Sequence, residues 1–139
     1  LQAVRQHCYV DDDFSTAQAN RIAALIQEKY GTRPEFLWKS APQHGVFRNQ
    51  QNQKWFGIIM YVDQDKITAG KGKIDVLNIK IDPDAREALS GTEGIYPAYH
   101  LNKKNWISVL MNESVSEEKI MQLVEASYRI VQGEGKRSR

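Results

Sequence analysis

The chain has 139 residues, of which 41% are hydrophobic and 26% are charged. These values indicate one globular domain that is large enough to build a single core without disulfide staples. The formal net charge is only +2, well below the strongly basic balance of a dedicated nucleic-acid binder. Any contact with DNA must therefore come from a local patch of cations.

The sequence shows no apolar run of membrane-spanning length and no stretch that reads as a secretory leader. Cys8 is the single cysteine, so it has no partner for an internal disulfide or a zinc knuckle. We therefore expect a cytoplasmic protein that makes no contact with a membrane.

The first helix is predicted to begin at Ser15. Ser15 and Gln18 have the spacing of a capping box, and apolar side chains follow at helical spacing until Gly31 ends the helix. We assign residues 1–14, which precede this signal, to the end of an upstream segment or to a linker.

Aromatic and β-branched residues then predict strands at 45–48 and 54–62, joined by a polar turn into a hairpin. Residues 63–73 read as a loop or wing at the far end of this hairpin. Residues 74–81 alternate strictly, which predicts a strand with Val76, Asn78 and Lys80 on one side. We expect that side to face polar surroundings.

Asp82 and Pro83 predict the start of a short helix that runs to about Ser90. Residues 106–111 alternate as a further strand, and the spacing of Ser114 and Glu117 predicts a capping box at the start of the last helix. Residues 132–139 form a basic tail with nothing to bury, and we expect this tail to be disordered.

Blocks at 34–38, 45–49, 52–60, 76–83 and above all 94–109 occur in an order that resembles the MmcQ/YjbR-like family. The resemblance covers about residues 17 to 131. It implies an α+β domain over residues 15–131, with an antiparallel sheet of about five strands packed against an N-terminal and a C-terminal helix, and a short inserted helix. It also implies a CyaY/frataxin-like or secretion-chaperone-like architecture, here as the C-terminal domain of a longer protein.

No residue set in the sequence spells out a catalytic mechanism. His7, His44 and His100 have neither the mutual spacing nor the carboxylates of a metal site, so we predict no metal. The run from Gly70 to Lys73 lacks the spacing of a phosphate loop. We therefore predict that the domain is not an enzyme and needs no cofactor.

The family is named as DNA-binding, and this resemblance implies a double-wing module that binds DNA weakly and mainly without sequence preference. Six cations are expected to contact phosphates: Arg48, Lys54, Lys71, Lys73, Lys80 and Lys103. Three residues are expected to orient the strand or read a groove: Tyr99, His100 and Asn102. Trp55 and Trp106 either stack on a base or belong to the core, and their apolar neighbours favour burial.

Two other readings stay open. The sheet face could serve as a protein-interaction adaptor, or Lys80 and His100 could hold a small anionic ligand. A positive surface stripe would favour nucleic acid, an apolar patch or free sheet edge would favour a protein partner, and a pocket enclosing Lys80 and His100 would favour a ligand.

Overall fold

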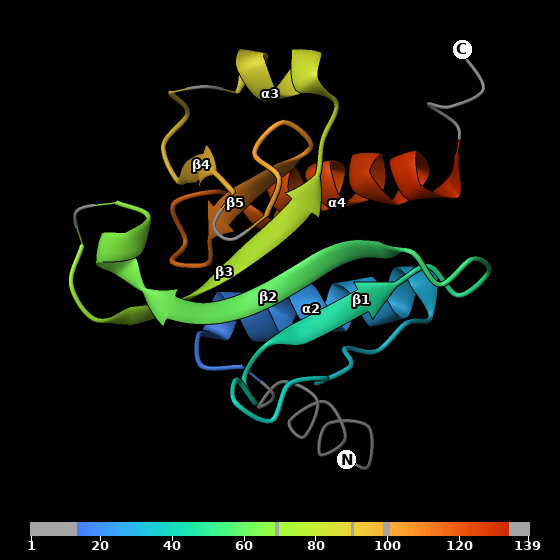
Figure 1. Ribbon diagram of the computed structural model, residues 1–139, viewed down its shortest axis with the longest axis horizontal. Coiled ribbons are helices and arrows are strands. Elements are labelled where there is room, and N and C mark those ends of the chain that lie inside the picture. Colours follow the sequence, from blue (N-terminus) through green and yellow to red (C-terminus); the bar gives the residue numbers. More distant parts are fainter. Residues whose placement is uncertain (1–13, 69, 90, 99–100, 134–139) are drawn as a thin grey trace.

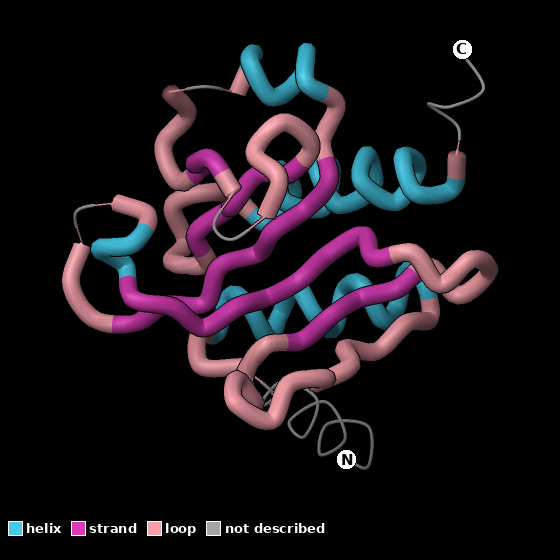
Figure 2. The backbone as a smooth tube through the Cα atoms, in the orientation of Figure 1, coloured by secondary structure: helices cyan, strands magenta, loops and turns pink. Residues whose placement is uncertain are grey.

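The computed structural model describes residues 14–68, 70–89, 91–98 and 101–133. The strands form one antiparallel sheet in the order β1-β2-β3-β5-β4, with α2 and α4 behind it and α3 between β3 and β4 (Figures 1 and 2). In chain order the elements are α2 (Ala17–Tyr30), β1 (Gly45–Arg48), β2 (Trp55–Asp63), the 3-10 helix η1 (Gln64–Lys66), β3 (Lys73–Lys80), α3 (Pro83–Ala88), β4 (Ile95–Pro97), β5 (Trp106–Leu110) and α4 (Glu117–Gln132). The predicted α+β fold with five strands is confirmed.

Both long helices begin at a different residue from the one predicted. Thr16, not Ser15, caps α2, because its hydroxyl accepts from the N–H of Ala19 at 3.2 Å. Gln18 does not close a capping box but is buried, with its amide bound to the backbone of Glu113 and Val115 at 2.9 Å each. This side chain therefore fastens α2 to the segment that precedes α4.

Ser116, not Ser114, caps α4, because its hydroxyl accepts from the N–H of Lys119 at 3.1 Å. The predicted end of α2 is confirmed, because Gly31 follows this helix with φ 69°. Gly133 follows α4 in the same way, with φ 99°. Such left-handed positions are the usual helix stop, and glycine adopts them without a Cβ penalty.

A β-bulge lies in β2. Phe47 pairs with Gly57 while Arg48 pairs with Trp55, so Phe56 is the extra residue. Pairing between β2 and β3 begins only at Gly57, and Figure 1 shows the two strands diverging beyond that point. The bulge therefore opens the sheet at this end.

Ser127 of α4 bridges this opening. Its buried hydroxyl donates to the carbonyl of Phe56 at 2.6 Å and accepts from the N–H of Lys80 at 2.9 Å. One side chain thus satisfies two backbone groups that the bulge separates, as buried polar backbone groups require.

The sheet has a buried cluster on each face. Leu77, Ile79 and Ile81 pack against α2 and α4, as part of the larger cluster. On the other face Val76 belongs to a second apolar cluster, against which Trp38 and Leu101 from loops and Tyr96 from β4 pack. The predicted alternation is therefore confirmed.

The prediction of polar surroundings for the second face is wrong for most of it. Asn78 is fully buried there, where it donates to the carbonyl of Ile58 at 3.3 Å and accepts a hydrogen bond from the hydroxyl of Ser108 on β5. Asn78 is thus hydrogen-bonded to another buried side chain, that of Ser108, and not to solvent.

Phe14 belongs to the folded domain. It is 6% exposed, its ring centroid lies 5.7 Å from that of Phe36, and its N–H donates to the side chain of Asn20 at 2.7 Å. The domain boundary therefore moves to residue 14, one position earlier than predicted. The rest of the predicted upstream segment, residues 1–13, and residues 134–139 of the predicted tail lie outside the described residues.

Within the part of the chain that the structure describes, no helix is long and apolar enough to cross a membrane.

Candidate nucleic-acid interface

A row of alternating cations and tryptophans crosses one end of the sheet on the face opposite the helices. Arg48 on β1 is the cross-strand neighbour of Trp55 on β2, and Lys80 on β3 is the neighbour of Trp106 on β5. The guanidinium carbon of Arg48 lies 5.9 Å from the Trp55 ring centroid, and the Lys80 ammonium lies 5.8 Å from that of Trp106. Both distances are those of cation–π contacts. We call these four residues the cation–tryptophan row.

The two tryptophans of the row are largely covered. Trp106 is 8% exposed and belongs to the second apolar cluster, so the prediction of burial is confirmed for it. Trp55 is half-buried, with Trp38 edge-on at 5.9 Å between ring centroids. The cation–tryptophan row therefore offers no open aromatic ring on which a base could stack, and it presents positive charge instead.

The two cations of the row differ in how far their charge is neutralised. The Nε of Arg48 lies 3.2 Å from a carboxylate oxygen of Glu35, in an ion pair that is partly shielded from solvent. Lys80 has no such ion pair with any described residue. Lys80 is therefore the stronger candidate of the two for a phosphate contact.

The polar groups of the loop before β5 make hydrogen bonds within the loop itself. The Lys103 ammonium donates to the carbonyl of Ala98 at 2.9 Å, and the Asn102 side chain accepts from the N–H of Lys104 at 2.8 Å. The Asn102 carbonyl also accepts from the N–H of Trp106 at 3.0 Å. Lys103 and Asn102 thus hold the turn that leads into β5, whereas the predicted site residues Tyr99 and His100 lie outside the described residues.

The turn between β1 and β2 is fastened to the helices. The side-chain amide of Gln50 donates to the carbonyl of Gly31 at 3.0 Å, and that of Asn52 donates to the carbonyl of Val131 at 2.9 Å. These carbonyls belong to the C-terminal ends of α2 and α4, which lack partners within their helices. Lys54 is exposed on a turn that is braced in this way.

The predicted wing at residues 63–73, between β2 and β3, lies at the other end of the sheet. Gln64 braces it with two hydrogen bonds, to the carbonyls of Lys71 at 2.9 Å and Gly72 at 2.8 Å. Lys71 is exposed, and the Lys73 ammonium lies 5.6 Å from the ring centroid of Tyr61. This wing presents two cations at its rim.

The structure does not gather the predicted residues into one patch. Lys73 begins β3 and Lys80 ends it, and seven steps of about 3.3 Å separate them by about 23 Å. One group of cations therefore lies around the cation–tryptophan row, and a second group lies at the β2–β3 connection.

Three cations of α2 and α4 are paired with carboxylates. Arg21 pairs with Glu113 and Glu117, and both Lys29 and Arg129 pair with Glu125. By contrast, five predicted site residues have no carboxylate within 4.0 Å in the described part of the chain: Lys54, Lys71, Lys73, Lys80 and Lys103. Among the described residues, lysines without a carboxylate partner thus lie mainly on the strands and their connections, and Lys119 on α4 is an exception.

The ionisable groups with clearly shifted pKa values lie away from the cation–tryptophan row. Burial raises the pKa of Asp75, although the N–H and hydroxyl of Thr16 bind one of its oxygens and oppose this rise. Burial also raises the pKa of Tyr30 to about 12. In the described ranges no three His, Cys, Asp or Glu side chains gather to hold a metal ion.

The family model described as YjbR matches residues 27–130. The uncharacterised protein YyaQ of Bacillus subtilis is 38% identical over 106 residues, which cover 76% of this chain and 90% of that protein. A crystal structure of a Pseudomonas syringae protein has 36% identity and a TM-score of 0.76, covering 79% of this chain and 95% of its own. A Deinococcus radiodurans protein shares the fold, with 23% identity, a TM-score of 0.64 and coverage of 90% and 84%. The match of the family model and the identity to these relatives show that the chain belongs to the YjbR family.

Proposed function

We propose that this domain binds nucleic acid, with DNA as the expected partner, through the phosphate backbone and with little sequence preference. The observation that carries the proposal is that five lysines of the strands and their connections have no carboxylate partner among the described residues, whereas Arg21, Lys29 and Arg129 of α2 and α4 are paired. A lysine without a carboxylate partner can bind a phosphate, and so release a counterion from the nucleic acid, without first breaking an ion pair within the protein.

Weak binding is expected from the small number of cations. A few phosphate contacts correspond to a dissociation constant on the order of 10⁻⁴ to 10⁻⁶ M at physiological salt. The two groups of cations lie about 23 Å apart, which is about seven nucleotides along one strand of a duplex at about 3.4 Å each. A ligand shorter than this reaches only one group.

The braced connections and covered tryptophans argue against reading of base edges. The side-chain amides of Gln50 and Asn52 already donate hydrogen bonds to helix ends, and the Lys80 ammonium lies over the ring of the buried Trp106. The described side chains thus favour contacts with phosphates, which position a protein without carrying sequence information. We therefore propose that the wings lie along the backbone.

Salt dependence of binding tests this proposal. Fluorescence anisotropy with a labelled duplex should give a linear fall of log K with log salt, and each lysine that contacts a phosphate contributes a slope of about 0.9. Lys80→Ala and Lys54→Ala should each flatten the slope by about that amount. Lys119→Ala on α4 is the matched control and should leave the slope unchanged. A wild-type protein without any salt-dependent binding at low ionic strength would refute the proposal.

A protein partner is the second candidate, because Phe36 and Leu37 stay 42% and 44% exposed on the segment before β1. The edges of the sheet do not favour addition of a strand. Val46 on β1 already pairs with Glu35, and Pro97 on β4 lacks an N–H. A partner would therefore bind through these apolar side chains, and replacing both with Ser should abolish its binding but leave the DNA salt slope intact.

We also propose that the domain acts in the cytoplasm, is not an enzyme, needs no cofactor and forms the C-terminal domain of a longer protein with a CyaY/frataxin-like plan. The lone cysteine supports the first point, and the absence of a catalytic motif in the sequence supports the second.

A further inference from the structure

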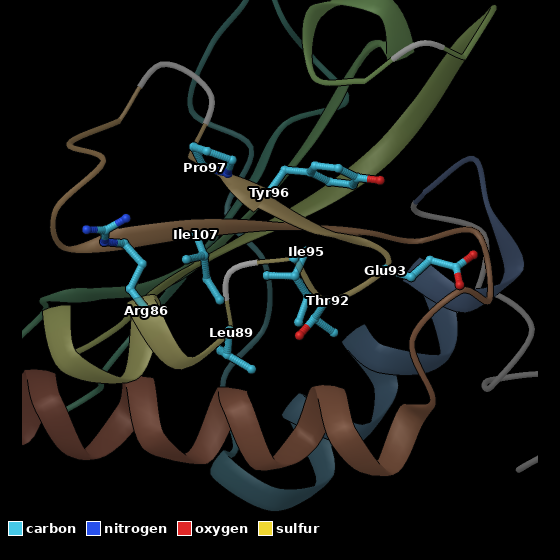
Figure 3. A pocket seen from close by; sticks show the side chains of 9 residues that line it. Arg86, Leu89, Thr92, Glu93, Ile95, Tyr96, Pro97 and Ile107 are labelled. Atoms are coloured by element: carbon cyan, nitrogen blue, oxygen red, sulfur yellow. The ribbon is translucent and has the colours of Figure 1, made fainter.

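A pocket of about 220 Å³ opens beside the edge strand β4 (Figure 3), and none of the four residues of the cation–tryptophan row lines it. Its walls come from α3, the turn that follows it, β4 and β5. The lining residues are Arg86, Leu89, Gly91, Thr92, Glu93, Ile95, Tyr96, Pro97 and Ile107. Lys80 does not line the pocket, so the pocket differs from the ligand site considered from the sequence, which required Lys80.

Arg86 brings an unused donor to this pocket. Its Nε is buried, and no acceptor for it exists among the described residues. The same side chain takes part in no ion pair there. A buried donor without an acceptor is costly, and native structures rarely leave one unless water, an ion or a ligand completes it.

The rest of the lining is mainly apolar near Arg86. Figure 3 shows Leu89, Ile95 and Ile107 between Arg86 at one end of the pocket and Glu93 at the other. All three apolar side chains also belong to, or pack against, the larger core cluster, which holds them in place. The pocket thus combines one guanidinium with a firm apolar wall.

We propose that this pocket binds a small monocarboxylate with a short apolar body. The carboxylate would accept hydrogen bonds from Arg86, whose planar fork matches its two oxygens. The apolar body would lie against Leu89, Ile95 and Ile107. The volume is below the ~300 Å³ at which pockets for drug-sized ligands begin, which restricts the ligand to a short chain.

The surrounding charge argues for a single negative charge on the ligand. Glu93 lines the opposite end of the pocket, and Asp84 and Glu87 flank Arg86 along α3. These carboxylates repel a dianion such as phosphate more strongly than a monoanion, whereas Arg86 alone contributes a cation to the lining. A monocarboxylate therefore fits the pocket better.

Amide NMR spectra of the whole protein test this, with isovalerate as the probe and isovaleramide as its uncharged match. Isovalerate should shift the amide signals of Leu89, Gly91, Ile95 and Ile107, with a dissociation constant on the order of 1 mM for so small a ligand. Isovaleramide and inorganic phosphate should bind at least about tenfold more weakly, because each lacks one of the two required features.

Substitution of Arg86 gives the second arm. Arg86→Gln should weaken isovalerate binding about tenfold or more while the amide spectrum stays dispersed, and Arg33→Gln, at an exposed arginine outside the pocket, should have no effect. The proposal is overturned if isovalerate produces no shifts at this pocket, if isovaleramide binds as well as isovalerate, or if both arginine variants bind like the wild type.

Discussion

Ser127→Ala tests whether the bulged end of the sheet depends on α4. The substitution removes the one hydroxyl that joins the carbonyl of Phe56 to the N–H of Lys80. A buried polar group left without a partner costs about 1 to 3 kcal/mol, and two groups are affected here. Because the strands can partly close on each other, we expect a loss of about 2 to 3 kcal/mol in the free energy of unfolding.

Urea denaturation at equilibrium measures this loss directly. The exposed neighbour Gln122→Ala is the control on the same helix and should change the free energy of unfolding by less than about 0.5 kcal/mol. The slope of the free energy of unfolding against urea concentration should stay the same in both variants, since neither substitution changes the surface exposed on unfolding. A Ser127→Ala protein as stable as the control would show that the bridge contributes nothing to the fold.

Three further predictions concern stability. Burial raises the pKa of Asp75, so the ionised side chain costs stability at neutral pH, and this cost disappears as pH falls below the ordinary Asp pKa near ~3.9. Asp75→Asn, which keeps an acceptor for Thr16, should therefore be more stable than the wild type at neutral pH, with a gain that shrinks in acid urea titrations; a variant that is less stable at neutral pH contradicts this. Deletion of residues 1–13 should leave a cooperative thermal transition, whereas an added Phe14→Ala should cost about 3 kcal/mol; equal stability of the two proteins would place Phe14 outside the core. Lys103→Ala should lower the melting temperature, because the ammonium ties the loop to Ala98, whereas Lys54→Ala should not; calorimetry that finds no difference between them would rule out the tether.

Local pattern was enough to predict most elements of the fold. The alternation in β3 and β5 reports which side chains face the helices, because burial on one face imposes a period of two. The glycine that ends α2 was predicted from a local signal as well. The cap of α2 was misplaced because Gln18 has the spacing of a capping box, although its partners, Glu113 and Val115, lie far away in the sequence.

Features that depend on distant partners could not be predicted. Asn78 looks solvent-facing in a strand, and only the structure reveals Ser108 beside it. The strand predicted at 74–81 already implied that Lys73 and Lys80 lie far apart, whereas the strands that flank β3 in the sheet could not be predicted. Arg86 lies on a short, exposed helix, so nothing in the pattern distinguished its buried Nε from an ordinary surface cation.

Amide NMR mapping with a short duplex DNA at low salt tests the central claim most directly. We expect shifts in the β1–β2 turn, at the end of β3 and in the β2–β3 connection, where the unpaired lysines lie, and no shifts on the outer surfaces of α2 and α4. The shifts should fade as salt is added, because counterion release drives the binding. Shifts concentrated on α2 and α4, or no shifts at low salt, would contradict the proposal that the unpaired lysines bind nucleic acid.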